Sequence, residues 1–187
     1  MNPPTHHTTS PPSDTSAPDD HEASDHPFSA TVLLLPLQQE EEPRFKWQTR
    51  LTANEGAGPN ARLRVRTRLT VAHWPGNIDA AARVADKLVD NAIRHAKPFG
   101  PGEGWIELRL TVLSGTDELL IETDDALPEF ADFNEAMSAT PSGPPPGLWW
   151  IRHYQGTLSW DPKTDATTGD VIGKTVTAFL PTTWGAA

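Results

Sequence analysis

The sequence predicts an α+β domain: a two-layer sandwich in which a mixed, mostly antiparallel sheet carries helices on one face. Several segments alternate apolar and polar residues, which is typical of strands with one buried face. One long segment repeats apolar residues every three or four positions, which is typical of an amphipathic helix. The order of strand pair, helix, strand pair, loop, short helix and strand pair suits a sheet covered by helices on one side.

The first 28 residues are expected to form a disordered acidic tail. They contain five Asp and Glu residues, no Lys or Arg, and many Pro, Ser and Thr. Such a segment buries too little apolar surface to offset the entropy of ordering it. We therefore expect the folded domain in residues 29–183 of the 187-residue chain.

Charge and composition exclude several classes of function. Of the 25 acidic residues, 20 lie outside the tail against 15 Lys and Arg, so the domain is acidic and is not expected to bind nucleic acid or an anionic membrane. The absence of cysteine excludes disulfides and thiolate metal sites. The longest apolar run, residues 32–35, is too short to span a bilayer, and the N-terminus lacks the pattern of a secretory signal, so we expect a cytoplasmic location.

The first elements are expected to be strands. Residues 30–37 are apolar and rich in β-formers, which predicts one short strand. Residues 45–51 and 63–71 both alternate, and the intervening residues 54–60 are rich in Gly and Asn. This pattern predicts a β-hairpin with one solvated face.

A helix of about five turns is expected over residues 78–96 from its repeat of apolar residues. Asn77 is a suitable N-cap, and Pro98 and Gly100 follow the last turn.

The second half of the chain is expected to add two strand pairs, at 105–113 with 118–123 and at 157–160 with 175–180. Between them, residues 126–146 contain five prolines and little periodicity, which predicts a long functional loop. A short helix over 148–154, closed by Gly156 as its C-cap, follows this loop.

Four stretches resemble, in order, the motifs of one ATPase superfamily. They are Leu88–Ala96, Leu120–Pro128, Pro146–Arg152 and Gly173–Val176. Together they resemble the GHKL superfamily, whose Bergerat-type ATP-binding fold is shared by gyrase, the 90-kDa chaperone, histidine kinases and anti-sigma-factor kinases. The resemblance covers about residues 62–181 and is closest to the anti-sigma-factor serine/threonine kinases and their stand-alone bacterial relatives.

The resemblance implies ATP and Mg²⁺ as cofactors and assigns roles to three side chains. Asn91 would coordinate Mg²⁺, Asp125 would accept a hydrogen bond from the exocyclic amine of adenine, and Thr175 would assist adenine binding through water. Taken alone, each is an ordinary residue of a helix surface, a turn or a strand.

The phosphates would lie against the start of the short helix. Gly147 would let the backbone approach them, and the helix beginning at Leu148 would direct its free N–H groups at them. The alternative is that Gly147 merely begins a helix after three prolines.

Three residues depart from the family pattern. Lys87 occupies the position of the usual catalytic glutamate, and a protonated lysine cannot accept a proton, so no catalytic residue is assigned. Lys87 could instead contact a phosphate. Leu127 and Pro145 replace two glycines, which removes backbone freedom where the family uses it.

The function implied is an ATP-binding regulatory protein that binds a sigma factor or an antagonist-like regulator, with phosphoryl transfer to serine left open by Lys87. Close relatives often form homodimers. One alternative is a degenerate interaction module that keeps the fold without turnover. Another is an ATPase half separated from a histidine kinase, which would need a partner chain carrying the phospho-accepting histidine.

Overall fold

A computed structural model describes residues 42–131, 133 and 147–183, all within one compact unit of residues 39–187. The predicted strand at 30–37, the predicted tail and the greater part of the loop at 126–146 lie outside the described residues. The described elements are β1 (Phe45–Thr52), α1 (Ala57–Val71), α2 (Ile78–His95), β2 (Trp105–Val112), β3 (Leu119–Asp125), α4 (Trp149–His153), β4 (Thr157–Thr164) and β5 (Val171–Leu180).

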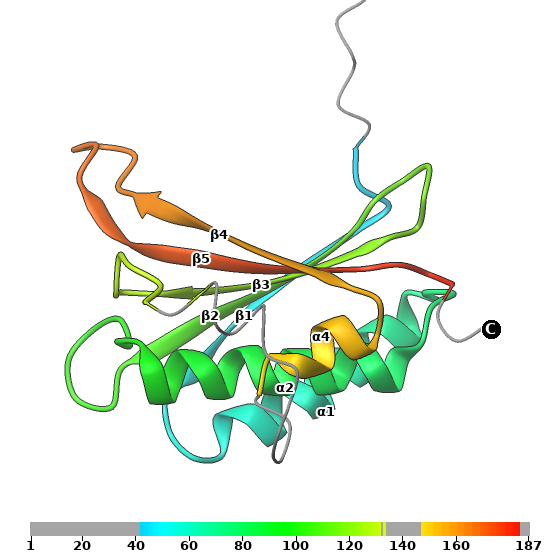
Figure 1. Ribbon diagram of the computed structural model, residues 1–187, viewed down its shortest axis with the longest axis horizontal. Coiled ribbons are helices and arrows are strands. Elements are labelled where there is room, and N and C mark those ends of the chain that lie inside the picture. The colour runs from blue at the N-terminus through cyan, green and yellow to red at the C-terminus, as the bar shows by residue number, and fades with distance from the viewer. Residues whose placement is uncertain (1–41, 132, 134–146, 184–187) are drawn as a thin grey trace, which may run out of the picture. The chain divides into compact units, whose positions relative to one another are not determined.

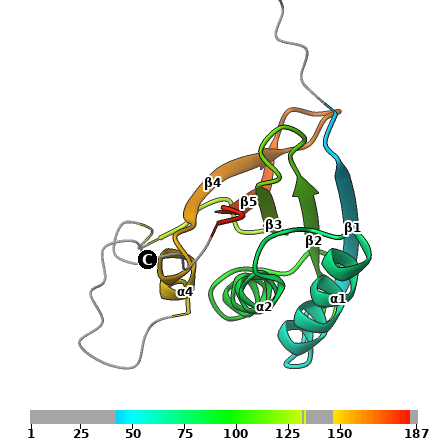
Figure 2. The same ribbon diagram turned by 90° about the vertical axis from the view of Figure 1, so that its right-hand side faces the viewer.

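The α+β class is confirmed. The five strands form one sheet in the order β1-β2-β3-β5-β4, and the helices lie on one face of it (Figure 1). Viewed along the helices, α2 lies between α1 and α4 (Figure 2). Every pair of neighbouring strands is antiparallel, so the expectation of a mixed sheet is wrong for these strands.

The predicted strand at 63–71 is wrong, because this segment belongs to helix α1. Its buried residues recur every fourth position, at Ala57, Ala61, Val65 and Leu69. An alternating pattern also places a residue at every fourth position, so residues 63–71 alone could not separate the two structures. The helix also includes residues 57–60, which the sequence predicts as a turn, and the small buried Ala57 there extends its apolar stripe.

The two long helices pack closely. A Cβ on Gly58 of α1 would lie only 2.5 Å from Oδ1 of Asp86 on α2, so a larger residue here would require the Asp86 side chain to move. Helix α2 begins as predicted: the side chain of Asn77 accepts a hydrogen bond from the backbone N–H of Ala80 at 2.9 Å. It ends at His95, one residue earlier than expected.

The remaining elements agree with the predictions to within a few residues, except that the last hairpin is longer at its turn. Helix α4 has Tyr154 as its C-cap, and Gln155 takes the left-handed conformation with φ 56°. Gly156 is therefore not the C-cap that the sequence predicts. It lies two residues beyond the C-cap and donates its N–H to the carbonyl of Ile151 at 2.9 Å. A Cβ there would lie 2.7 Å from the carbonyl oxygen of Phe179, so close packing on β5 explains the glycine.

The core lies between the sheet and the helix layer. The inward residues of β2 and β3 are fully buried against the apolar faces of α1 and α2. In the part of the chain that the structure describes, no helix has the length and apolar character to cross a membrane.

Two leucines of α1 distinguish the helix from the predicted strand. In a strand, Leu63 and Leu69 would lie on the same face, whereas in the helix Leu69 is fully buried and Leu63 is 67% exposed. We predict that Leu69→Ala lowers the free energy of unfolding by about 2–5 kcal/mol. Leu63→Ala should change it by less than about 0.5 kcal/mol in the same urea titration, and equal losses would contradict the helix.

Candidate functional site

Two neighbouring carboxylates at the end of β3 lie on opposite faces of the sheet. Asp124 is opposite Thr175 of β5, and Asp125 is opposite Lys174. Because successive strand residues alternate, Asp125 shares the helix-facing side with Thr123, and Asp124 lies on the outer side. Both carboxylates are fully buried.

Asp125 is bound through only one of its oxygens. Oδ1 accepts hydrogen bonds from Nζ of Lys174 at 2.8 Å and from the backbone N–H of Leu127 at 2.9 Å. Oδ2 is buried and has no partner among the described residues. Burial raises the pKa of Asp125, although the bonds from Lys174 and Leu127 act in the opposite direction.

A second unpaired atom lies two residues away on the same face of β3. The hydroxyl oxygen of Thr123 is buried without a partner, and it and Oδ2 of Asp125 are the side-chain atoms in this state within the described residues. An unsatisfied buried polar group costs about 1–3 kcal/mol, so native proteins rarely leave one without a ligand or water. This face of β3 is therefore a candidate binding surface.

The Gly173-Lys174-Thr175 stretch brings β5 against this end of β3. A Cβ on Gly173 would lie 2.0 Å from the carbonyl oxygen of Asp125, so only glycine allows the two strands to approach so closely. Lys174 then reaches Asp125, and Thr175 reaches Asp124 on the other face.

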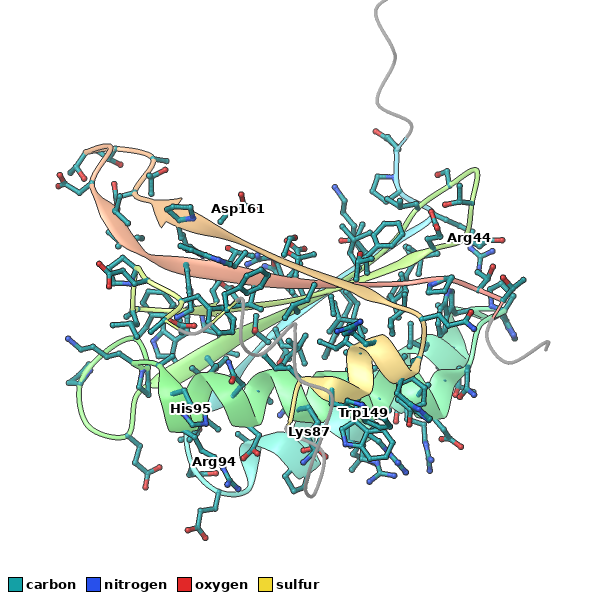
Figure 3. The ribbon with its side chains drawn as sticks, viewed as in Figure 1. Arg44, Lys87, Arg94, His95, Trp149 and Asp161 are labelled. Carbon is teal, nitrogen blue, oxygen red and sulfur yellow. The ribbon has the colours of Figure 1, made fainter. Side chains whose placement is uncertain are left out.

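The end of β3 is also hydrogen-bonded to the segment that directly follows α2. The backbone N–H of Ala126 donates to the carbonyl of Lys97 at 2.6 Å. Asp125 therefore lies near the C-terminal end of α2, which carries Arg94 and His95 (Figure 3).

A row of polar residues on α2 faces α4. Arg83, Lys87 and Asn91 are spaced four apart and are half-buried, so they lie along one side of the helix. The Arg83 guanidinium stacks over Trp150 of α4 at 4.6 Å. The Cδ atom of Lys87 lies 4.0 Å from the position of a Cβ on Gly147. The fold thus brings the predicted residues Lys87 and Gly147 together, with Asn91 one turn closer to the end of α2.

Leu148 and Asn91 offer different groups to a ligand. The side chain of Leu148 is buried in the core, so only its backbone is available, and α4 begins after it at Trp149. The side chain of Asn91 is half-buried and makes no side-chain hydrogen bond within the described residues.

Thr175 is not brought to Asp125. Its hydroxyl donates to Oδ1 of Asp124 at 2.8 Å on the outer face. Lys174 is the β5 side chain beside Asp125 instead.

Asp124 is the centre of a charged network on the outer face. Arg109 binds it through two bonds, Nη1 to Oδ2 at 2.5 Å and Nη2 to Oδ1 at 2.8 Å, and Lys163 of β4 also binds it. Burial raises the pKa of Asp124, but the hydrogen bonds from Arg109, Lys163 and Thr175 outweigh burial and lower it. Asp124 is therefore a charged structural group with all its acceptors in use, unlike Asp125.

Sequence reasoning missed Thr123 and Lys174. Both follow from the alternation once Asp125 is assigned: Thr123 is two residues earlier on the same strand, and Lys174 is next to Thr175 on the opposite face of β5. Neither residue type by itself signals a buried site.

This chain is similar to several proteins of known structure. No protein-family model matches the sequence, and no curated protein matches it. Among solved structures, a histidine kinase domain from the Erythrobacter litoralis EL346 blue-light activated histidine kinase aligns at 17% identity and a TM-score of 0.37, covering 56% of this chain and 44% of that one. The mycobacterial sensor histidine kinase MprB aligns at 14% identity and a TM-score of 0.42, covering 75% of this chain and 100% of that one.

The outer-face network generates a prediction about stability. Asp124→Asn removes the buried charge that Arg109 and Lys163 share and leaves these half-buried cations only Glu122 and Glu107 as partners, so we expect it to lower the free energy of unfolding by about 1.5–3 kcal/mol at neutral pH. Because the pKa of Asp124 is lowered from 3.8, its stabilisation is complete above that value and is lost as the pH falls through the folded-state pKa.

Urea titrations at several pH values test this. The variant should lose less stability on acidification than the wild type. Asp161→Asn, at an exposed position of β4, is the control and should behave as the wild type (Figure 3). A variant as stable and as acid-sensitive as the wild type would contradict the role of Asp124.

Proposed function

We propose that this protein binds Mg-ATP between the helix-facing end of β3 and the α4-facing side of α2, and that it acts as a regulatory protein. The observation that carries the proposal is the buried, unpaired Oδ2 of Asp125 beside the unpaired hydroxyl of Thr123. A ligand that donates a hydrogen bond would remove the cost of both atoms.

Adenine suits this end of the site. Its exocyclic amine would donate to Oδ2 of Asp125, and a bond to a charged acceptor contributes about 1.5–3 kcal/mol. The hydroxyl of Thr123 can donate or accept, so it can bind a ring nitrogen of the base or a water next to it. Buried Ile121, two residues before Thr123 on the same face, provides apolar surface.

The row on α2 suits the metal and the phosphates. The amide oxygen of Asn91 is a hard ligand appropriate to Mg²⁺, which keeps several waters and takes further oxygens from phosphates. A site of this kind needs no carboxylate cluster, and among the described residues no group of three His, Asp or Glu side chains could hold a metal. The ammonium of Lys87, beside Gly147, would neutralise phosphate charge.

These residues suit the binding of ATP better than its hydrolysis or the transfer of its phosphate. Lys87 stands on α2 where a general base would be needed, and a protonated amine cannot take a proton from water or from a serine hydroxyl. We therefore propose that bound ATP controls the capture of a protein partner, a sigma factor or an antagonist-like regulator. Phosphoryl transfer to serine would need a base supplied by that partner, and a homodimer is part of the same proposal.

Calorimetric titration with Mg-ATP tests the site. Asp125→Asn puts an amide that can also donate in place of the carboxylate, and we expect it to weaken binding about tenfold to a hundredfold. Asn91→Ala should reduce the difference in affinity measured with and without Mg²⁺. Asp161→Asn, at the exposed β4 position, is the matched control and should bind as the wild type does.

The outcome also separates the proposal from a degenerate interaction module. Wild-type protein without affinity for Mg-ATP would contradict the proposal and favour such a module. If the protein binds Mg-ATP but ATP does not change its affinity for a protein partner, the nucleotide site stands and the regulatory role is contradicted.

Thr123→Val provides an independent prediction. The change replaces a hydroxyl that has no partner by a methyl group of similar size, so we expect the free energy of unfolding to stay the same or rise slightly. Affinity for Mg-ATP should nevertheless fall severalfold. Urea unfolding and calorimetry on the same sample measure both, and unchanged affinity would place Thr123 in the core alone.

A further inference from the structure

Lys174 is a buried lysine that contacts the carboxylate proposed to bind the base. Its side chain is 3% exposed, and Nζ lies 2.8 Å from Oδ1 of Asp125 and 3.1 Å from the carbonyl oxygen of Leu127. The ring of Phe130 lies 5.8 Å from Nζ, which adds an apolar neighbour. Sequence reasoning gave this residue no role.

Stability alone is a weak reason for this pair. Replacing a buried ion pair by apolar residues is often neutral or stabilising, because desolvation of the two charges offsets their attraction. Stability therefore gives no specific reason for charges at positions 125 and 174. The pair therefore points to a function for the charges.

Of the two carboxylate oxygens of Asp125, one accepts hydrogen bonds and the other accepts none among the described residues. Lys174 and the backbone N–H of Leu127 both donate to Oδ1, so this oxygen holds the carboxylate in one orientation. Oδ2 is left buried and unpaired. The ligand therefore meets a single oxygen in a fixed position.

The protonation state of Asp125 decides what this oxygen can recognise. A carboxylate only accepts hydrogen bonds, whereas a neutral carboxylic acid can also donate. An acceptor fits a purine with a 6-amino group, and a donor fits a purine with a 6-oxo group. Burial raises the pKa of Asp125, whereas Lys174, through its hydrogen bond and charge, and the backbone N–H of Leu127 both act to lower it and so favour the carboxylate form.

We propose that Lys174 is a specificity-determining positioning residue that fixes Asp125 as an acceptor, so that the site selects 6-amino over 6-oxo purine nucleotides. The inference rests on the proposed function and deepens it. Lys174 acts through Asp125 and does not itself contact the base.

Lys174 opposes a rise in the pKa of Asp125 that burial causes. Burial raises its pKa, and the adjacent Asp124 on β3 adds to the rise, whereas the hydrogen bond and charge of Lys174 on β5 oppose it. Asp124 is itself paired with Arg109 and Lys163 on the outer face. Removal of Lys174 should therefore raise the pKa of Asp125 further and favour the neutral acid.

The experiment compares Mg-ATP with Mg-ITP, which differ in the 6-amino and 6-oxo groups. Affinities are measured by calorimetry for the wild type, Lys174→Met and Lys163→Met. The control variant also removes a lysine that pairs with a β3 aspartate, but on the opposite face. Urea unfolding establishes that each variant is folded.

We expect the wild type to prefer ATP over ITP by about tenfold or more, with a ratio that is constant from about pH 6 to pH 8.5. In Lys174→Met the ratio should fall about tenfold at the acidic end and recover as rising pH ionises Asp125. Lys163→Met should keep the wild-type ratio.

Other outcomes overturn the inference. If Lys174→Met weakens ATP and ITP equally and the ratio is unchanged, Lys174 is only structural, and ATP binding by the wild type still stands. If the wild type binds neither nucleotide, the proposed function fails first. Should Lys174→Met not fold, a wild-type ratio that falls toward one at acidic pH would show that Lys174 does not fix the acceptor state.

Discussion

The site depends on the alternation of β3 at its last two residues, which turns adjacent carboxylates to opposite faces of the sheet. Each carboxylate meets its own cation on a neighbouring strand: Asp124 meets Arg109 on the outer face, and Asp125 meets Lys174 on the helix side. Two buried like charges so close in sequence would be costly without these partners. Gly173 makes the arrangement possible, because no side chain fits where β5 passes the end of β3.

The two carboxylates differ in how many of their oxygens accept hydrogen bonds, and this gives them different roles. Asp124 has donors on both oxygens, so it is a structural anchor that holds β2, β3, β4 and β5 together. Asp125 has donors on one oxygen and an unpaired second oxygen next to the unpaired hydroxyl of Thr123. The face toward α2 therefore has two unpaired polar atoms, and Asn91 on α2 adds a side-chain amide. In the proposed complex the base of the nucleotide binds the first two, and the metal-bound phosphate lies at Asn91.

The sequence predicted the class of the fold and most elements, because α2 and the strands have clear periodicity. It failed at α1, where the alternating residues Val65 and Leu69 also fit a four-residue repeat, and where buried alanines carry too little hydrophobicity to identify the helix. For the site, Asp125 was identified through a motif. Lys174 could not be, since its role depends on which strand lies beside β3, and that pairing is set by the tertiary fold.

The proposed binding of a ligand amine to the free oxygen of Asp125 can be measured directly. The most direct measurement is the side-chain carboxyl ¹³C chemical shift of Asp125 and of Asp124 during titration with Mg-ATP. We expect a saturable change at Asp125 and little change at Asp124, whose oxygens already accept hydrogen bonds. Saturation with ATP that leaves the Asp125 signal unmoved, or that shifts both signals equally, would contradict it.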